Sequence, residues 1–189
     1  MSDLLTRTLD GADLPGAGRW TIDPSHSSAA FSVRHLGLSK VRGRFGSFTG
    51  AIEVGERPED TWVTASVDAS SIDTKDPKRD EHLRSPDFFD VATHPTLEFR
   101  STAVSGSGDR WELRGDLTIR GTTRPVVLDV TSEGVATDPW GGTRAAFSAT
   151  TEIDREAFGL TWNQALESGG LLVGKKVRID LEVEVVRAA

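Results

Sequence analysis

Apolar and polar residues alternate strictly near the C-terminal end of this sequence. From residue 176 to residue 185, one face carries Val177, Ile179, Leu181, Val183 and Val185, and every residue on the other face is charged. A repeat of two residues is typical of an antiparallel β-strand with one face buried and the other in water. The segment therefore predicts a strand that covers a protein interior.

The same alternation recurs in shorter runs from Trp20 onward, separated by turn sequences such as 106–109 and 138–142. The positions expected to face inward are Phe31, Val33 and His35; Val41, Gly43 and Phe45; Val63, Ala65 and Val67; Leu97, Phe99 and Ser101; Trp111, Leu113, Gly115, Leu117 and Ile119; Val126, Leu128 and Val130; and Phe147, Ala149, Thr151 and Ile153. With a further strand near Ile52, the pattern predicts an all-β chain of eight or nine strands. That number is close to what closes a small barrel.

One segment, residues 76–91, breaks the alternation. Asp76-Pro77 is a typical start of a helix, with the aspartate as N-cap and the proline in the first turn. Ser85-Pro86 ends it, because the residue before a proline avoids the α region. The same pair can cap a second short turn that carries Phe88 and Phe89. We therefore expect a single short helical insertion between strands.

The first 18 residues show no periodicity and contain Gly11, Pro15, Gly16 and Gly18. We expect a flexible N-terminal segment over residues 1–18 and one barrel domain over residues 19–189. Acidic and basic residues interrupt any apolar run at the N-terminus, so we expect neither a secretory signal nor a membrane span. The expected location is the cytoplasm.

Composition narrows the classes of partner. The chain has 189 residues, a net charge of −7 and no cysteine. The acidic balance argues against non-specific binding of nucleic acid and gives no electrostatic reason to dock on an anionic membrane. The absence of cysteine excludes disulfides and thiolate metal sites.

The inward face mixes bulky residues with small ones such as Gly43, Ala65, Gly115 and Ala149. An eight-stranded barrel has room either for its own side chains or for one small ligand. Small inward residues fit a tapering packed core as well as a container, so periodicity alone leaves both open. A long apolar tail would suit an apolar bore, since burial contributes roughly 0.8 kcal/mol per methylene.

A few polar residues stand out against this background. His35 lies on the apolar face of its strand, where it is either a satisfied core histidine or a contact for a ligand head group. Arg79, Asp80 and His82 gather on the helical segment, either as a local ion-pair cluster that fixes the helix to the barrel or as a polar patch at the barrel mouth. Trp162 lies in a loop-like stretch and is expected either to rim an opening or to plug the core, and the same holds for Trp140.

Known catalytic and metal motifs are missing from the sequence. It contains no Gly-x-Ser-x-Gly, no Walker sequence and no HExxH, and no close pair of histidines with metal-ligand spacing. We therefore expect no enzymatic activity, no metal and no cofactor.

Several segments together resemble the YceI-like family of lipocalin-like, polyisoprenoid-binding proteins. In family order they are WTIDPSHS (20–27), FSVRHLG (31–37), VRGRF (41–45), IDT (72–74), RDEHL (79–83), SPDFFDV (85–91), Pro95, FRST (99–102), GDLTIRG (115–121) and DREAFGL (154–160). Each is a weak signal by itself, but the ordered series from Trp20 to Leu160 is specific.

The resemblance implies an extended, lipocalin-like, eight-stranded antiparallel β-barrel with a short helical insertion. It also implies an apolar tunnel that holds a long-chain isoprenoid or a related amphipathic lipid, for storage, transport or sequestration. An isoprenoid quinone, a polyprenyl phosphate and a fatty-acid derivative are the candidate ligands. The residues expected to bind the ligand are Phe31, Val33, His35, Val41, Phe45, Val67, Arg79, Asp80, His82, Leu83, Phe88, Phe89, Leu97, Phe99, Leu117, Ile119, Phe147, Phe158 and Trp162.

Two alternatives stay open at this stage. One is an enzyme of isoprenoid or lipid metabolism that uses Arg79, Asp80 and His82, with His35 as a further candidate, which requires these groups to converge on one pocket. The other is a packed barrel that acts only as an interaction module, which requires a filled interior. We expect no nucleic-acid partner and no stable membrane insertion, and the sequence leaves a homodimer open.

Overall fold

The alternating C-terminal segment is strand β13 (Val173–Arg187), the central element of the computed structural model, which describes residues 5–188. β13 pairs antiparallel with β12 (Thr143–Asp154) from Lys176 to Val186. On its other edge it pairs first with β4 (Ser28–His35) and then with β3 (Gly18–Ile22). β12 is the first strand in the sheet order, and its additional pairing with β13 closes the sheet into a barrel.

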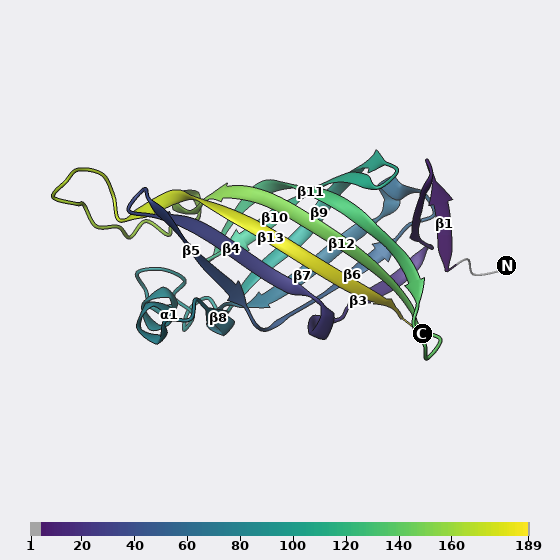
Figure 1. Cartoon of the computed structure of the whole chain (residues 1–189), viewed down its shortest axis with the longest axis horizontal. Helices are drawn as coiled ribbons and strands as arrows, with labels where there is room; N and C mark the ends of the chain where they lie inside the picture. Colours follow the sequence, from purple (N-terminus) through teal and green to yellow (C-terminus); the bar gives the residue numbers. More distant parts are fainter. Residues whose placement is uncertain (1–4, 189) are drawn as a thin grey trace.

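The other strands complete an antiparallel ring, in which the order is β13-β12-β11-β10-β9-β7-β6-β3 and back to β13. At three positions in the ring, two consecutive strands together take the place of one long strand. These pairs are β3 and β4, β5 and β6, and β7 and β8. The bounds not yet given are β5 (Ser39–Phe45), β6 (Phe48–Val54), β7 (Trp62–Asp68), β8 (Ile72–Asp73), β9 (Thr96–Ser107), β10 (Arg110–Ile119) and β11 (Thr122–Thr137). The predicted eight-stranded antiparallel barrel is confirmed. Figure 1 shows it from the side as an elongated barrel.

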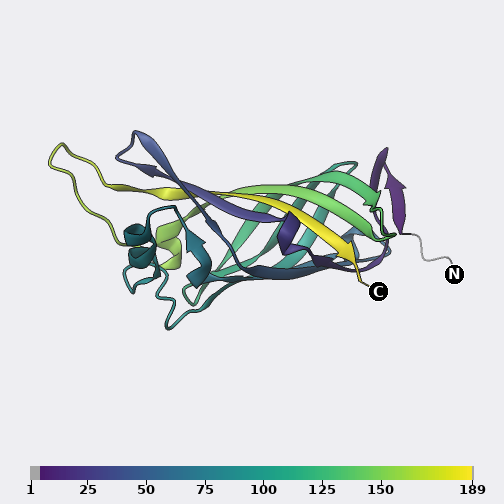
Figure 2. The ribbon, with the colours of Figure 1, turned by 60° about the horizontal axis from the view of Figure 1, so that its bottom comes forward.

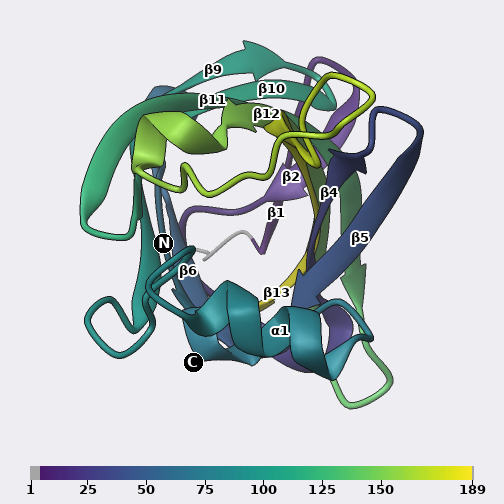
Figure 3. The same cartoon turned by 90° about the vertical axis from the view of Figure 1, so that its left-hand side faces the viewer.

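The predicted helical insertion is also confirmed, as α1 (Pro77–Arg84). The Asp76 carboxylate accepts hydrogen bonds from the backbone N–H groups of Lys78 and Arg79, as expected of an N-cap. α1 lies across one end of the barrel, beside β8, which pairs with the end of β5 (Figures 1 and 3). Of residues 5–188, no helix is both long enough and apolar enough to cross a bilayer.

The N-terminal segment differs from our expectation of a flexible lead, although residues 1–4 lie outside the described part. Strands β1 (Thr6–Leu9) and β2 (Ala12–Pro15) form a hairpin at the barrel end opposite α1 (Figures 1 and 2). Its turn, Asp10-Gly11, has positive φ at both residues, the geometry for which Asp-Gly is preferred. Leu14 and Pro15 are buried, and this burial explains why the segment is structured.

Packed side chains gather near the two ends of the barrel. Near α1, buried residues include Phe88, Leu97 and Phe158, the last from η4 (Arg155–Phe158). Near the N-terminal hairpin, fully buried Trp20 packs with Val54, Ala145 and Val185. The Trp20 indole donates a hydrogen bond to the carbonyl oxygen of Gly16, which ties the hairpin to the barrel. The hydrophobic core therefore consists of two separate clusters, one near each end of the barrel. We call the interior of the barrel between these ends the bore.

Candidate ligand-binding site

The barrel interior contains a cavity of about 300 Å³ that extends from the N-terminal hairpin to the middle of the bore. Leu14 and Pro15 line its hairpin end. Its wall is almost entirely apolar and includes Ile52, Val63, Ala65, Val67, Phe99, Leu113, Leu117, Leu128, Phe147, Leu181 and Val183. These are the inward positions of the alternating strands, so strand periodicity directly produces the apolar lining.

A second cavity, of about 410 Å³, occupies the α1 end. The two cavities adjoin, because five residues line both of them: Phe31, Phe45, Leu97, Ile119 and Ile179. Each volume is within the range of about 300 to 1,000 Å³ that is typical of ligand pockets. Figure 3 looks along the bore from the α1 end, with the N-terminal hairpin at its far side. These cavities contradict the filled interior that the packed-barrel alternative requires.

Inward-facing glycines explain part of this hollowness. A Cβ atom at Gly43 would lie 2.4 Å from the ring of Phe31, its neighbour on β4. Similarly, a Cβ at Gly115 would lie 2.4 Å from the ring of Phe99. Each phenylalanine therefore lies against the bare backbone of the wall, where a side chain of normal size would push its ring away.

All but one of the predicted ligand-binding residues line these cavities. Val67, Phe99, Leu117 and Phe147 line the hairpin-end cavity. Those that line the α1-end cavity are Val33, His35, Val41, Arg79, His82, Leu83, Phe88, Phe89, Phe158 and Trp162. Phe31, Phe45, Leu97 and Ile119 line both. The exception is Asp80, and whether the others contact a ligand stays a prediction.

Asp80 has a structural partner instead of a place in the wall. Its side chain is buried, and Oδ1 accepts hydrogen bonds from the backbone N–H of Thr74, at 2.9 Å, and from the Thr74 hydroxyl, at 2.5 Å. The Arg79 Nε donates to the same hydroxyl oxygen, at 2.8 Å. Arg79 also donates to the Thr74 carbonyl oxygen, at 2.9 Å. Arg79 and Asp80 therefore fasten α1 to residue 74, and Asp80 does not face the bore.

His82 belongs to an aromatic group at the α1 end. Its ring meets Trp162 edge to face at 4.7 Å and Phe88 at 5.1 Å between ring centroids. Its Nε2 lies 2.8 Å from Oδ2 of Asp87. His35 lines the same cavity, but no hydrogen bond or ion pair joins it to His82 in the described structure. Trp162 thus closes part of this end, whereas Trp140 is 88% exposed and lines neither cavity.

The α1-end cavity has a basic wall, of which the sequence patterns indicated Arg79 but not the other members. Among the described residues, the cationic side chains that line it are those of Arg34, Lys78, Arg79 and Arg155, and no aspartate or glutamate does so. Arg34 and Lys78 are exposed to solvent, so the cavity reaches the surface beside them. Within residues 5–188, their side chains form no ion pair with a carboxylate at 4.0 Å or less. Arg34 lies on the polar face of its strand, so strand alternation assigned it to the outside.

Arg155 is the buried member of this group, only 4% exposed. Its guanidinium donates hydrogen bonds to the backbone carbonyl oxygens of Leu160, Trp162 and Gly174 at 2.6 to 2.9 Å. These bonds hold the segment after η4 against the start of β13. Burial lowers the pKa of Arg155, yet an arginine stays charged at neutral pH. Its carbonyl partners carry no formal charge, so it adds positive potential to this end of the bore.

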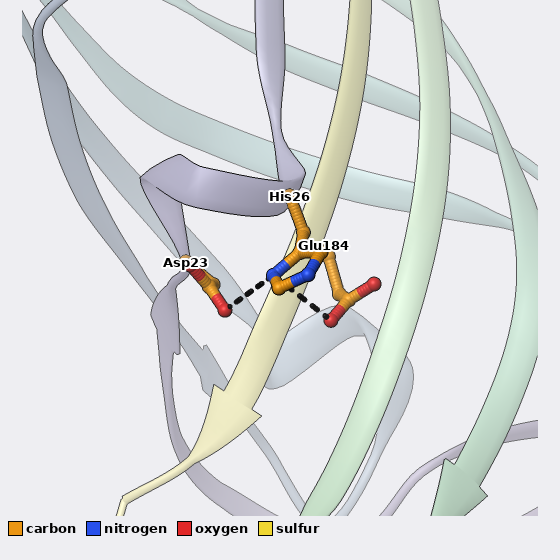
Figure 4. Close-up of side chains that lie close together, drawn as sticks. All are labelled: Asp23, His26 and Glu184. Carbon is orange, nitrogen blue, oxygen red and sulfur yellow. Dashed lines mark hydrogen bonds and ion pairs between the residues drawn. The ribbon is translucent and has the colours of Figure 1, made fainter. Parts of the chain in front are cut away.

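A second polar cluster lies on the outside of the barrel and joins Asp23, His26 and Glu184 (Figure 4). His26 belongs to η1 (Pro24–His26), and its Nδ1 lies 2.9 Å from Oδ2 of Asp23 and 4.0 Å from Oε1 of Glu184. Nη1 of Arg144 lies 2.8 Å from the same Asp23 oxygen and 2.5 Å from the same Glu184 oxygen. The Arg144 guanidinium already supplies the positive charge that a metal ion would bring to these carboxylates. The cluster therefore serves as an ion-pair network between β12, η1 and β13.

A model of the YceI-like domain matches residues 20–185 of the chain. The chain belongs to the YceI-like family. A UPF0312 protein of Shewanella denitrificans is 38% identical over 197 residues, covering 99% of this chain and 100% of that protein. The family assignment inferred from the ordered motifs is therefore confirmed.

Two solved structures share the fold of this barrel. BcnA of Burkholderia cenocepacia superposes with a TM-score of 0.74 at 22% identity, over 86% of this chain and 98% of that one. A polyisoprenoid binding domain from Saccharophagus degradans superposes with a TM-score of 0.70 at 13% identity, over 89% and 98%. At these identities the likeness concerns the fold.

Proposed function

We propose that this protein binds a single long-chain amphipathic lipid of the isoprenoid type within its barrel and stores or carries it. The tail lies along the two adjoining cavities, and the head lies at the basic α1 end. The observation that carries this proposal is the unfilled apolar bore with four cations in the wall of its α1 end. Within residues 5–188, the wall of the hairpin-end cavity has one cation, Arg7, and one carboxylate, Glu98. The fold shared with a polyisoprenoid binding domain supports the choice of an isoprenoid.

The charge distribution favours an anionic head, such as the phosphate of a polyprenyl phosphate or the carboxylate of a fatty acid. Arg34 and Lys78 are exposed at the mouth and have no carboxylate partner in the described structure, so they are available to a ligand. Arg155 adds a positive charge deeper in the bore. A quinone head carries no charge and would gain less from this arrangement.

The proposed role is binding without catalysis. The enzymatic alternative needs Arg79, Asp80 and His82 to act on one bound molecule. Asp80 is instead bonded to Thr74, and His82 to Asp87. A general acid or base must lie within hydrogen-bond reach of the reacting group, and the Asp80 carboxylate does not face the bore.

The test is to extract the purified protein with organic solvent and to record a mass spectrum of the extract. We expect about one long-chain amphiphile per protein molecule. Phe31→Asp places a charge where the two cavities meet and is expected to lower the lipid content at least about tenfold, because an unpaired charge in an apolar bore is very unfavourable.

Val127→Asp is the matched control, since Val127 lies on β11, lines neither cavity and is 37% exposed. This variant should keep its lipid. Circular dichroism verifies that both variants are folded. An undiminished lipid content in folded Phe31→Asp, or no lipid in the unmodified protein after incubation with a polyprenyl phosphate, refutes the proposal. The mass of the head group distinguishes phosphate, carboxylate and quinone.

A further inference from the structure

Two segments lie side by side at the α1 end of the barrel, and the second of them projects well beyond α1. One is the turn between β4 and β5, residues 36–38, and the other is the loop over residues 161–172 (Figures 1 and 2). The backbone N–H of Leu36 donates to the carbonyl oxygen of Leu172 at 2.9 Å, which joins the two segments. We call residues 34–42 together with residues 163–172 the tip.

The tip carries exposed leucines. Leu38 is 81% exposed, Leu171 is 45% exposed and Leu36 is 41% exposed. Leu36 also has a φ of +56°, followed by Gly37 at +69°, a turn geometry in which asparagine, aspartate or glycine is normally preferred. A leucine that is exposed and in an unfavourable backbone conformation stabilises neither the turn nor the core, which indicates a role outside the fold.

Cations surround these leucines, although the whole chain is acidic. Residues 24–52 contain Arg34, Lys40, Arg42 and Arg44 but no aspartate or glutamate. Arg34, Lys40 and Arg42 are exposed, and in the described structure none of them lies within 4.0 Å of a carboxylate oxygen. The one acidic residue of the tip is Glu167. Exposed leucines flanked by unpaired cations are the combination that partitions into the interface of an anionic bilayer.

We propose that the tip docks on the surface of an anionic lipid bilayer. The leucines enter the interface, and Arg34, Lys40 and Arg42 contact the lipid phosphates. Arg34, His35 and Leu172 also line the α1-end cavity, so docking places the mouth of the bore against the bilayer. This inference rests on the proposed function for its purpose, because a lipid carrier must load and unload at a membrane. The docking step itself is measurable whether or not the bore holds a lipid.

The experiment is co-sedimentation of the full chain with vesicles. One set contains phosphatidylcholine and phosphatidylglycerol, and the other contains phosphatidylcholine alone. We expect binding to the anionic vesicles, weakened by salt, and little binding to the neutral ones. Leu38→Asp is expected to lower the partition coefficient at least about tenfold, because it removes an apolar contact and adds a negative charge near the lipid phosphates.

Trp140→Asp is the matched control, because Trp140 is 88% exposed in the turn 138–142 at the barrel end opposite the tip. It should leave vesicle binding unchanged. Leu171→Asp tests the second segment and replaces Leu38→Asp should that variant not fold. Equal binding to both sets of vesicles, or unchanged binding by a folded tip variant, overturns the proposal. A dimer that dissociates in the tip variants would assign the tip to a second copy of this chain and also overturn it.

The lipid content of the same preparations separates this proposal from the proposed function. If Leu38→Asp loses vesicle binding but keeps its bound lipid, docking is supported on its own. If the protein contains no lipid and yet binds anionic vesicles through the tip, the docking proposal stands while the proposed function fails.

Discussion

At the scale of single residues, Asp80 connects α1 to the barrel through Thr74. Asp80→Ala removes the acceptor of both the Thr74 N–H and the Thr74 hydroxyl, in a place where Thr74 is only 5% exposed. We expect the free energy of unfolding to fall by about 2 to 3 kcal/mol, the usual cost of buried donors that lose a charged partner. Urea denaturation measures it, with Glu81→Ala, an exposed carboxylate on the same helix, as the control.

Lipid content provides the second measurement for Asp80. If the residue is only structural, folded Asp80→Ala retains its lipid. A variant with unchanged stability and lost lipid would contradict the role assigned here.

The comparison of Asp80 with its neighbours shows what a sequence can indicate about single residues. Strand alternation placed Phe31, Phe99 and Phe147 in the bore correctly, because the direction of a strand side chain follows from its position alone. Asp80 was named as a ligand-binding residue within the Arg79–His82 group, for which a cluster that fixes the helix to the barrel was the alternative, and its bonds to Thr74 agree with that alternative. Its real partner, Thr74, lies six residues away across a turn, and nothing in the local pattern indicates that contact. The bonds of Arg155 to backbone carbonyl oxygens are equally invisible in a sequence.

At the scale of elements, the N-terminal hairpin closes the barrel end opposite α1. Nη1 of Arg7, on β1, donates to the backbone carbonyl oxygens of Gly55 and Glu56, at 2.9 Å each. Arg7→Ala removes these bonds, and we expect the amides of β1 and β2 to exchange hydrogen about tenfold faster, while amides of β13 keep their protection. Hydrogen exchange detected by mass spectrometry resolves the two regions.

Arg19→Ala is the control for this prediction, since Arg19 pairs with Glu53 on the barrel wall and its side chain is 58% exposed. It should change exchange in the hairpin little. Equal effects of the two variants, or faster exchange throughout the barrel in Arg7→Ala, would show that Arg7 does not hold the hairpin specifically.

The elements themselves were predictable to different degrees. Strands with one buried face carry a two-residue pattern, and α1 begins and ends at recognisable residues, so both were located. The hairpin was missed, although Asp10-Gly11 is a strong turn signal, because the flanking strands are only four residues long and show little alternation. At some positions of the ring two short strands, such as β3 and β4 or β5 and β6, replace one long strand. This arrangement depends on how the sheet closes, and no local sequence pattern predicts it.

At the scale of the whole molecule, net charge concealed a local arrangement. A total of −7 gave no electrostatic reason to dock on an anionic membrane, yet folding brings four cations to one cavity, in whose wall no carboxylate of residues 5–188 lies. Acidic residues lie elsewhere, for example on the outer face of β12 and β13, where Glu152 pairs with Lys176 and Asp180 pairs with Arg178. Total charge describes average solubility, whereas recognition depends on which residues the fold places side by side.

The ion pairs of Arg144 join parts of the barrel that are distant in sequence. The Arg144 guanidinium forms ion pairs with the carboxylates of Asp23, Asp138 and Glu184. It thereby links the start of η1, the turn 138–142 and β13. The hydrogen bonds of Ser25, Arg144 and His26 lower the pKa of Asp23, and those of the Gly142 amide and Arg144 lower the pKa of Asp138. A carboxyl group whose pKa is lower in the folded state stabilises the fold above its unfolded pKa of about 3.9. That contribution is lost as the pH falls through the folded value.

Arg144→Met should therefore lower the melting temperature by about 5 °C at neutral pH, and the difference from the unmodified protein should shrink as the pH falls below about 3.9. Thermal unfolding followed by circular dichroism over a pH series measures both effects. Arg57→Met is the control, because within residues 5–188 Arg57 forms ion pairs only with its sequence neighbours Glu59 and Asp60. Its side chain is 67% exposed, so its removal should change little at any pH. A difference for Arg144→Met that stays constant down to low pH would mean that the arginine stabilises the barrel by packing, since loss of charge on the carboxylates would then have no effect.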